Sequence, residues 1–333
     1  GKGPVKRSVF DQPRKVVSGM VYSGAIIGML VISLAFSVTV AVLSKTLGMT
    51  VDEISQTDVY KYFSYLLYQI VYIAVILAFA FIYRSKPAAF GWRKASHPKY
   101  YLIGLVLLFG LMFSLNFVNN AFVAFLGLFG YKLPSSSLPS LEGGGIVGVL
   151  IVVALLPALL EETIFRGIIL EGIKDVGTVA VCLLGGALFC IFHQNPAQTV
   201  YQFVCGAAFT LLAVRADSLL PTVLIHFVNN AVIIFNEKFA FLEGLPAGGE
   251  IAIYVVSAVC LLASLAYLIF IDKRGNRKRE GEIKPFSYAA LAGILLCALF
   301  WVINLVSGIG GCKCRRSHWF AWANSRKNSM RTP

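Results

Sequence analysis

Nine long hydrophobic runs without a charged residue restrict what this chain can fold into. Each run holds about 17 residues or more, and a helix that crosses a bilayer needs roughly 20. The runs are continuous and do not alternate with polar residues, which favours helices over barrel strands. We therefore predict an all-α fold, a polytopic transmembrane helical bundle of eight or nine spans. The runs cover residues 16–44, 62–83, 100–131, 143–160, 176–192, 196–214, 219–235, 251–271 and 286–311.

The overall composition points to lipid as the solvent. Of the 333 residues, 58% are hydrophobic and only 14% are charged, whereas a soluble domain carries about 25% charged residues. A globular protein must still present a charged surface to water, so burial of a soluble core does not explain this deficit. The first run is too long for a cleavable signal peptide and lacks a small-residue cleavage site, so we expect it to remain as a span.

The net charge of +13 could suggest a nucleic-acid partner, but the position of the charges argues against one. Loop 84–99 has five basic residues and no acidic one, and loop 272–285 has six basic and three acidic residues. Loops 45–61 and 236–250 are more acidic than basic. This alternation follows the positive-inside rule. It predicts a multi-pass cell-membrane protein whose N-terminal segment 1–15 is cytoplasmic.

The chain divides into segments by composition. Three N-terminal transmembrane helices are expected within 16–131, and a polar Pro/Gly/Ser-rich loop separates them from the block 146–236. That block has shorter spans, tighter loops and the charges embedded in hydrophobic sequence, so we expect it to be the catalytic intramembrane core. Two further transmembrane helices are expected within 251–311. The tail 312–333 carries six basic residues in a composition unlike the rest, which indicates either a non-native end or a miscounted span.

The first candidate motif follows the run 143–160 directly. A charged side chain at bilayer depth costs at least about 2.5–3.5 kcal/mol, so such residues are rare and usually functional. Glu162 and Arg166 are four residues apart, share a helix face and can form an ion pair. Glu161 is rotated by about 100° from Glu162, which leaves its carboxylate free for chemistry. The alternative is that all three form a structural polar cluster between helices.

Two further motifs lie downstream in the same block. Phe189 and His193 share a face of the FCIFH segment, where apolar surroundings favour a neutral imidazole base. His226 and Asn230 are one turn apart in HFVNN, and Asn229 adjoins them; their donors can hold a developing oxyanion. Each motif alone is explained equally well without catalysis, by an interfacial histidine or by an interhelical hydrogen bond. Combined with the free glutamate, they form a hydrolytic set.

The three segments EETIFR, FCIFH and HFVNN match, in order, the motifs EExxxR, FxxxH and HxxxN. The sequence thus resembles the CPBP family of intramembrane proteases, which includes the type II CAAX prenyl proteases and the bacteriocin-processing and abortive-infection relatives. The resemblance covers roughly residues 146–236. Each motif is weak alone, but the ordered trio in a polytopic chain is specific. Family abundance favours a bacterial member.

The resemblance implies an intramembrane endopeptidase that acts on a peptide or a lipid-anchored protein. Glu161 and His193 match the residues that activate the attacking water, and His226 and Asn230 match those that form the oxyanion hole. The remaining matches are supporting positions: Glu162 and Arg166. The alternative function is a non-catalytic membrane partner, or a bacteriocin self-immunity protein, that retains the protease fold. A transporter with a proton relay is disfavoured because we find no inverted repeat.

The family has been described as metalloproteases, but this chain lacks the HExxH motif of the usual zinc proteases. A zinc site built from Glu161, His193 and His226 is chemically possible. We expect no cofactor, because the asparagine and paired histidines also suit an oxyanion hole. Five of the seven cysteines lie in apolar runs, where a thiol acts as a small hydrophobe. Cys312 and Cys314 lack a second ligand pair with zinc spacing.

The expected depths of two site residues conflict. With a turn near Gly172, Glu161 would lie roughly 18 Å above the turn and His193 roughly 30 Å above it, at 1.5 Å per residue. The two side chains could then meet only if helices in the block are tilted or broken. Proline residues in the block are candidates for such breaks.

Overall fold

The computed structural model describes residues 13–133, 138–242 and 246–309, and these residues contain helices and no strand. Eight of their helical segments are long and apolar enough to cross a membrane, and a ninth apolar helix is shorter, Thr178–Phe192. The predicted all-α bundle of eight or nine spans is therefore confirmed. The eight are Arg14–Leu47, Asp58–Tyr83, Lys99–Leu128, Gly145–Val176, Pro196–Ala216, Leu220–Phe239, Gly248–Ile271 and Lys284–Ile309.

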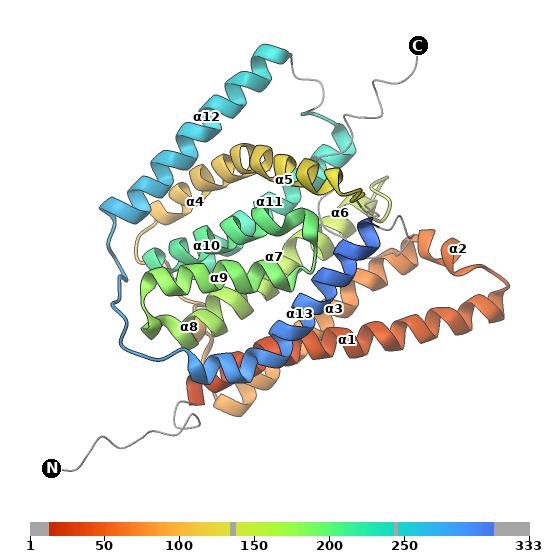
Figure 1. Ribbon diagram of the computed structural model, residues 1–333, viewed down its shortest axis with the longest axis horizontal. Helices are drawn as coiled ribbons and strands as arrows, with labels where there is room; N and C mark the ends of the chain where they lie inside the picture. Colours follow the sequence, from red (N-terminus) through yellow and green to blue (C-terminus); the bar gives the residue numbers. More distant parts are fainter. Residues whose placement is uncertain (1–12, 134–137, 243–245, 310–333) are drawn as a thin grey trace.

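The core of the bundle is the central group of helices in Figure 1. It comprises α6 (Gly145–Val149), η4 (Leu150–Leu155), α7 (Leu156–Glu162), η5 (Thr163–Ile169), α8 (Leu170–Ile173), η6 (Lys174–Val176), α9 (Thr178–Phe192), η7 (Pro196–Gln198), α10 (Thr199–Ala216) and α11 (Leu220–Phe239). The segments η4 and η5 are π-helical and lie on either side of α7. Such wide turns are frequent at functional sites.

Other helices cover this core on two sides (Figure 1). One side has α1 (Pro13–Leu47), α2 (Val51–Gln56), α3 (Asp58–Tyr83) and α13 (Lys284–Ile309); the other has α4 (Lys99–Gly110), η3 (Leu111–Leu115), α5 (Asn116–Leu128), α12 (Ala247–Ala266) and η8 (Tyr267–Ile271). The short η2 (Pro87–Phe90) lies between α3 and α4. Helix α1 packs against α13 and α3, and α12 packs against α4 and η3.

The positively charged loops meet at one end of the bundle. Ser96 N donates to Ala216 O at 2.8 Å, and Thr178 N donates to Arg277 O at 3.1 Å. Lys15 forms a 2.7 Å ion pair with Asp175. We call this region, residues 13–15, 84–98, 174–178, 215–219 and 272–283, the basic end. Its grouping agrees with the predicted alternation of loops, whereas the cytoplasmic location of the N-terminus stays a prediction.

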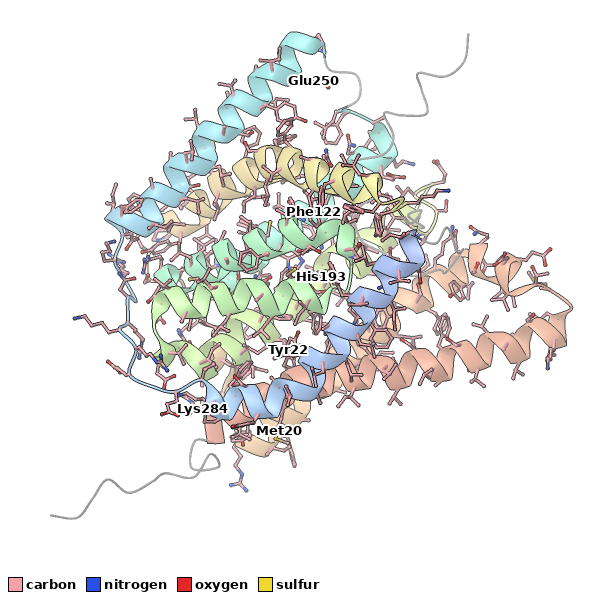
Figure 2. The ribbon with its side chains drawn as sticks, in the orientation of Figure 1. Met20, Tyr22, Phe122, His193, Glu250 and Lys284 are labelled. Atoms are coloured by element: carbon pink, nitrogen blue, oxygen red, sulfur yellow. The ribbon has the colours of Figure 1, made fainter. Side chains whose placement is uncertain are left out.

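The last turn of α13 lies at the opposite end of the bundle, where Lys132 N donates to Gly308 O at 3.1 Å. This placement corresponds to nine helical passes when the short α9 is counted with the eight longer spans. Three of the eight spans precede the core and two follow it, and Figure 2 labels Glu250 and Lys284 near the starts of these last two. The tail 312–333 lies outside the described residues.

The turn into α9 is at Gly177 and not near Gly172, which corrects the expectation from sequence. Gly177 has a φ of 99°, a conformation that favours glycine. Gly172 is helical and lies against α1, where an added Cβ would be 1.8 Å from Ser18 Oγ. Since Glu161 and His193 are each sixteen residues from Gly177, both lie about 24 Å from the turn along their helices. The expected depth mismatch therefore disappears.

Candidate active site

A buried ion pair lies at the centre of the core. Arg166 Nη1 donates to Glu162 Oε1 at 2.9 Å, and the two side chains are 1% and 0% exposed. Arg166 Nη2 donates to Gly206 O at 3.1 Å. The guanidinium carbon is 4.4 Å from the ring centre of Phe189 and 5.4 Å from that of Phe209. The pair expected from the four-residue spacing is therefore present, and two aromatic faces and a carbonyl surround its cation.

The close approach of α9 and α10 makes this arrangement possible. A Cβ at Gly206 would lie 2.9 Å from the Cα of Gly186 and 3.1 Å from the Cβ of Phe189. Only hydrogen fits at that crossing. The carbonyl of Gly206 and the Phe189 ring are thereby held close enough to contact the same guanidinium.

His226 lies between the two glutamates. Its Nδ1 is 2.8 Å from Glu162 Oε1, and its Nε2 is 4.0 Å from Glu161 Oε2. Glu162 is the ion-pair partner of Arg166 and acts as an acceptor, so His226 donates from Nδ1. The 4.0 Å separation is too long for a direct hydrogen bond. Within the described chain Glu161 is thus outside the Glu162–Arg166 pair, as its rotation on the helix predicted.

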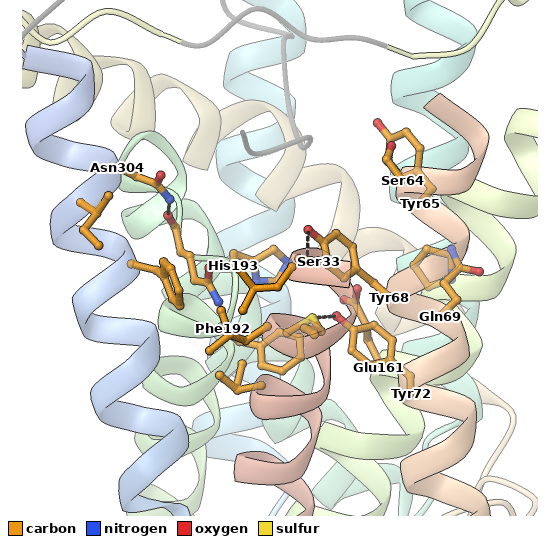
Figure 3. A pocket seen from close by; sticks show the side chains of 18 residues that line it. Ser33, Ser64, Tyr65, Tyr68, Gln69, Tyr72, Glu161, Phe192, His193 and Asn304 are labelled. Atoms are coloured by element: carbon orange, nitrogen blue, oxygen red, sulfur yellow. Dashed lines mark hydrogen bonds between the residues drawn. The ribbon is translucent and has the colours of Figure 1, made fainter. Parts of the chain in front are cut away.

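Glu161 and His193 line the same cavity, which has a volume of about 340 Å³. Figure 3 shows side chains from α1, α3, α7, α13 and the end of α9 around it. His193 Nδ1 is 2.7 Å from the carbonyl oxygen of Phe189. A carbonyl can only accept, so the proton is on Nδ1 and Nε2 is left as an acceptor. The structure therefore brings the carboxyl group of Glu161 and the imidazole of His193 to one space.

The wall of the cavity formed by α3 was missed by the sequence reasoning. Five polar or aromatic side chains line it, with the spacing of a single helix face: Ser64, Tyr65, Tyr68, Gln69 and Tyr72. Tyr68 accepts a 3.4 Å hydrogen bond from Ser33 of α1, and Gln69 donates to Val152 O. The available signal was this three-and-four-residue repeat of polar groups in an otherwise apolar run.

The contribution of helix α13 to the cavity was also missed. Asn304 lines the cavity and its Nδ2 donates to Gln194 O at 2.7 Å, as drawn in Figure 3. Trp301 Nε1 donates to Thr199 Oγ1 at 2.9 Å. Gln194, which follows His193, has a φ of 52°. A C-terminal helix thus holds the turn that follows His193, and the polar atoms of two residues in an apolar run were the only signal for it.

Asn230 is held away from the cavity. Its Nδ2 donates to Val153 O at 3.3 Å, and its Oδ1 accepts from Asn229 Nδ2 at 3.1 Å. Asn229 Oδ1 in turn accepts from Tyr201 at 3.0 Å. Neither Asn230 nor His226 is among the residues that line the cavity. The oxyanion role of these two residues stays a prediction.

Zinc stays an alternative to a metal-free site. Within the described ranges, no three His, Cys, Asp or Glu side chains are grouped closely enough to hold a metal. Both histidines use Nδ1 for other contacts, so only their Nε2 atoms could serve as ligands of zinc together with Glu161. Cys312 and Cys314 lie outside the described residues. The remaining cysteines are free and buried or half-buried: Cys182, Cys190, Cys205, Cys260 and Cys297.

Comparison with known proteins gives one family. The family model described as type II CAAX prenyl endopeptidase Rce1-like matches residues 143–232. This range spans Glu161, Glu162, Arg166, His193, His226 and Asn230. No curated protein and no solved structure matches the chain. The match agrees with the segment delimited by the three sequence motifs and supports a CAAX protease-like assignment.

Proposed function

We propose that the chain is an intramembrane endopeptidase, because residues 143–232 match the Rce1-like family model and eight helices are long and apolar enough to cross a membrane. The observation that carries this proposal is that Glu161 and His193 line one cavity. Glu161 is outside the neighbouring ion pair, and His193, whose Nδ1 is bound to Phe189 O, lines the same space. The membrane is the cell membrane, with the N-terminus in the cytoplasm.

Water activation is assigned to Glu161 and His193. Nε2 of His193 accepts a hydrogen bond from the water and orients it, while the carboxylate of Glu161 removes the other proton. The water oxygen then attacks the carbonyl carbon of the scissile peptide bond. Glu161 next gives the proton to the leaving amine, so that the C–N bond breaks and the carboxylate is regenerated.

Stabilisation of the oxyanion is assigned to His226 and Asn230 on the basis of the motif match; neither residue lines the cavity, so the substrate would have to extend past Glu161 to reach them. A histidine that donates from Nδ1 to Glu162 can also donate from Nε2 only when it is an imidazolium. The Nδ1 contact with Glu162 connects this donor to the supporting ion pair. Asn230 Nδ2 has a second hydrogen beyond the one given to Val153 O. Donors aimed at a developing negative charge are usually the largest catalytic contribution.

The substrate is a peptide or a lipid-anchored protein that reaches the cavity from the membrane. The experiment is cleavage of a peptide library by the full chain in liposomes, compared with Glu161→Ala. Products are expected from the wild type and none above background from the variant. Equal background turnover in both would support the non-catalytic partner or self-immunity protein instead. A parallel arm with a chelator, followed by zinc, separates a metal-dependent enzyme from a glutamate-type enzyme.

A further inference from the structure

A second cavity, of about 350 Å³, lies at the basic end and is distinct from the space around Glu161. It is surrounded by the loops 84–98 and 272–283, by the turn between α10 and α11, and by the first turns of α9. Six basic residues line this space: Arg93, Arg166, Lys174, Arg215, Arg274 and Arg277. The acidic lining residues are Glu171 and Asp217. Basic residues therefore outnumber acidic residues in the lining by six to two.

Three of the cations have carboxylate partners. Arg93 Nη2 lies 2.6 Å from Glu171 and 2.5 Å from Asp217. Lys174 also pairs with Glu171. Arg166 belongs to the buried pair described above. Both acidic lining residues are therefore already engaged.

Arg215 donates to neutral acceptors only, and the carboxylate of Asp272 interacts with its charge from beyond ion-pair distance. Its side chain is buried and donates to Leu268 O at 2.9 Å, Arg274 O at 2.7 Å and Asn276 Oδ1 at 2.6 Å. No ion pair of Arg215 with a carboxylate occurs within 4.0 Å in the described chain. It therefore contributes a fixed positive charge to the wall of the cavity.

Arg274 and Arg277 lie at the rim and are exposed. Their guanidinium groups make no hydrogen bond or ion pair with any described residue, although the loop itself is fixed. Arg277 N donates to Thr178 Oγ1 at 2.9 Å, and Thr178 N donates to Arg277 O. Two unpaired guanidinium groups are thus held at the mouth of a cavity by backbone contacts that do not use them.

The N-terminus of α9 adds to the positive potential. Thr178 and Val181 line the cavity, and no side chain caps the helix at Gly177. Thr178 N is already bound to Arg277 O, but the remaining amides in the first turn of this 15-residue helix favour a negative charge nearby. Unpaired guanidinium groups, a buried arginine and a helix N-terminus therefore all lie around one small cavity.

The location favours a lipid. The cavity lies where α8, α9 and α10 reach their loops, which is the level of lipid head groups. Basic pockets between transmembrane helices on the positively charged side bind anionic head groups. We propose that this cavity binds the phosphate of an anionic phospholipid, with Arg274 and Arg277 as its direct ligands. Free phosphate offers similar chemistry and has to be distinguished by experiment.

The test is native mass spectrometry of the full chain in detergent, titrated with phosphatidylglycerol or with phosphatidylcholine. Saturable binding of phosphatidylglycerol is expected for the wild type. Each basic residue near an anionic lipid contributes roughly a factor of five. The double variant Arg274→Gln/Arg277→Gln should therefore bind about 25-fold more weakly. Both side chains are exposed and unpaired, so an unchanged unfolding temperature is expected and checks the fold.

The matched control is Lys278→Gln/Arg279→Gln. It removes the same charge from the same loop, at positions that do not line the cavity. An equal loss of affinity in the control would show general electrostatic attraction and overturn the proposal. Equal binding of phosphatidylcholine would also overturn it. In a third arm, inorganic phosphate at the lipid concentration should not displace the lipid; full displacement would contradict a lipid site. None of these readouts depends on proteolysis.

Discussion

Two adjacent glutamates have different surroundings because successive side chains of a helix point about 100° apart. Glu162 Oε1 receives both Arg166 Nη1 and His226 Nδ1, at 2.9 and 2.8 Å. Glu161 has neither contact at hydrogen-bonding distance and lines the cavity instead. The positive charge of Arg166 thus stabilises one carboxylate and leaves the other available for proton transfer.

The first prediction concerns that pair. Arg166→Met should destabilise the fold by about 3–5 kcal/mol, because it leaves the carboxylate of Glu162 buried without a partner. Arg166→Met/Glu162→Gln should recover much of this loss. The measurement is unfolding in mixed detergent micelles, with Arg84→Met as the exposed control. A single variant at least as stable as the double variant would contradict the structural role of the pair.

At the scale of elements, α13 fixes the turn that carries His193, although it lies outside residues 143–232. Its two anchors are the hydrogen bonds from Asn304 to Gln194 O and from Trp301 to Thr199. The turn contains Gln194 in a left-handed conformation, which a non-glycine residue adopts at some energetic cost. We infer that α13 stabilises this turn and with it the direction of the imidazole.

The second prediction follows for Asn304. Asn304→Leu should lower kcat by about 10- to 100-fold with little change in KM, because small displacements of catalytic groups have effects of that size. Stability should fall by only about 1 kcal/mol. The control is Val302→Leu on the same helix, where the side chain is 49% exposed. An unchanged kcat in Asn304→Leu would show that α13 does not position His193.

The spacing of residues along the chain predicted the helices and the ion pair. It did not predict the roles of individual glycines or the walls of the cavity. The helices and the Glu162–Arg166 pair depend on residues near in sequence, so they were predictable. Gly172 and Gly177 look alike in sequence, yet one allows close packing on Ser18 and the other a positive φ. Only tertiary contacts separate these two uses. The same reason explains why the polar face of α3 was missed.

At the scale of the whole molecule, the positively charged loops gather at one end, and the last turn of α13 lies at the other. Glu161 and His193 lie about 24 Å from Gly177 along their helices, and a hydrocarbon core is about 30 Å thick. The candidate active site is therefore nearer to the end opposite the positive loops. The phosphate site proposed above and the cavity with Glu161 would then face different leaflets.

The third prediction concerns orientation. In a variant without its native cysteines, Glu142→Cys should react with a membrane-impermeant maleimide in intact cells. Lys86→Cys, in a loop rich in basic residues, should react only after the cells are permeabilised. Both positions are exposed, so accessibility to the reagent depends on the side of the membrane. The reverse pattern would contradict a cytoplasmic N-terminus.

The proposed role of Glu161 in activating the attacking water is tested most directly by the initial rate at which purified chains in liposomes cleave one peptide. Glu161→Gln keeps the shape of the side chain but removes the base, so the rate should fall by about 10²–10⁴-fold. Glu142→Gln, an exposed glutamate in a loop, should keep the wild-type rate. A correctly folded Glu161→Gln chain that cleaves the peptide as fast as the wild type would contradict the account.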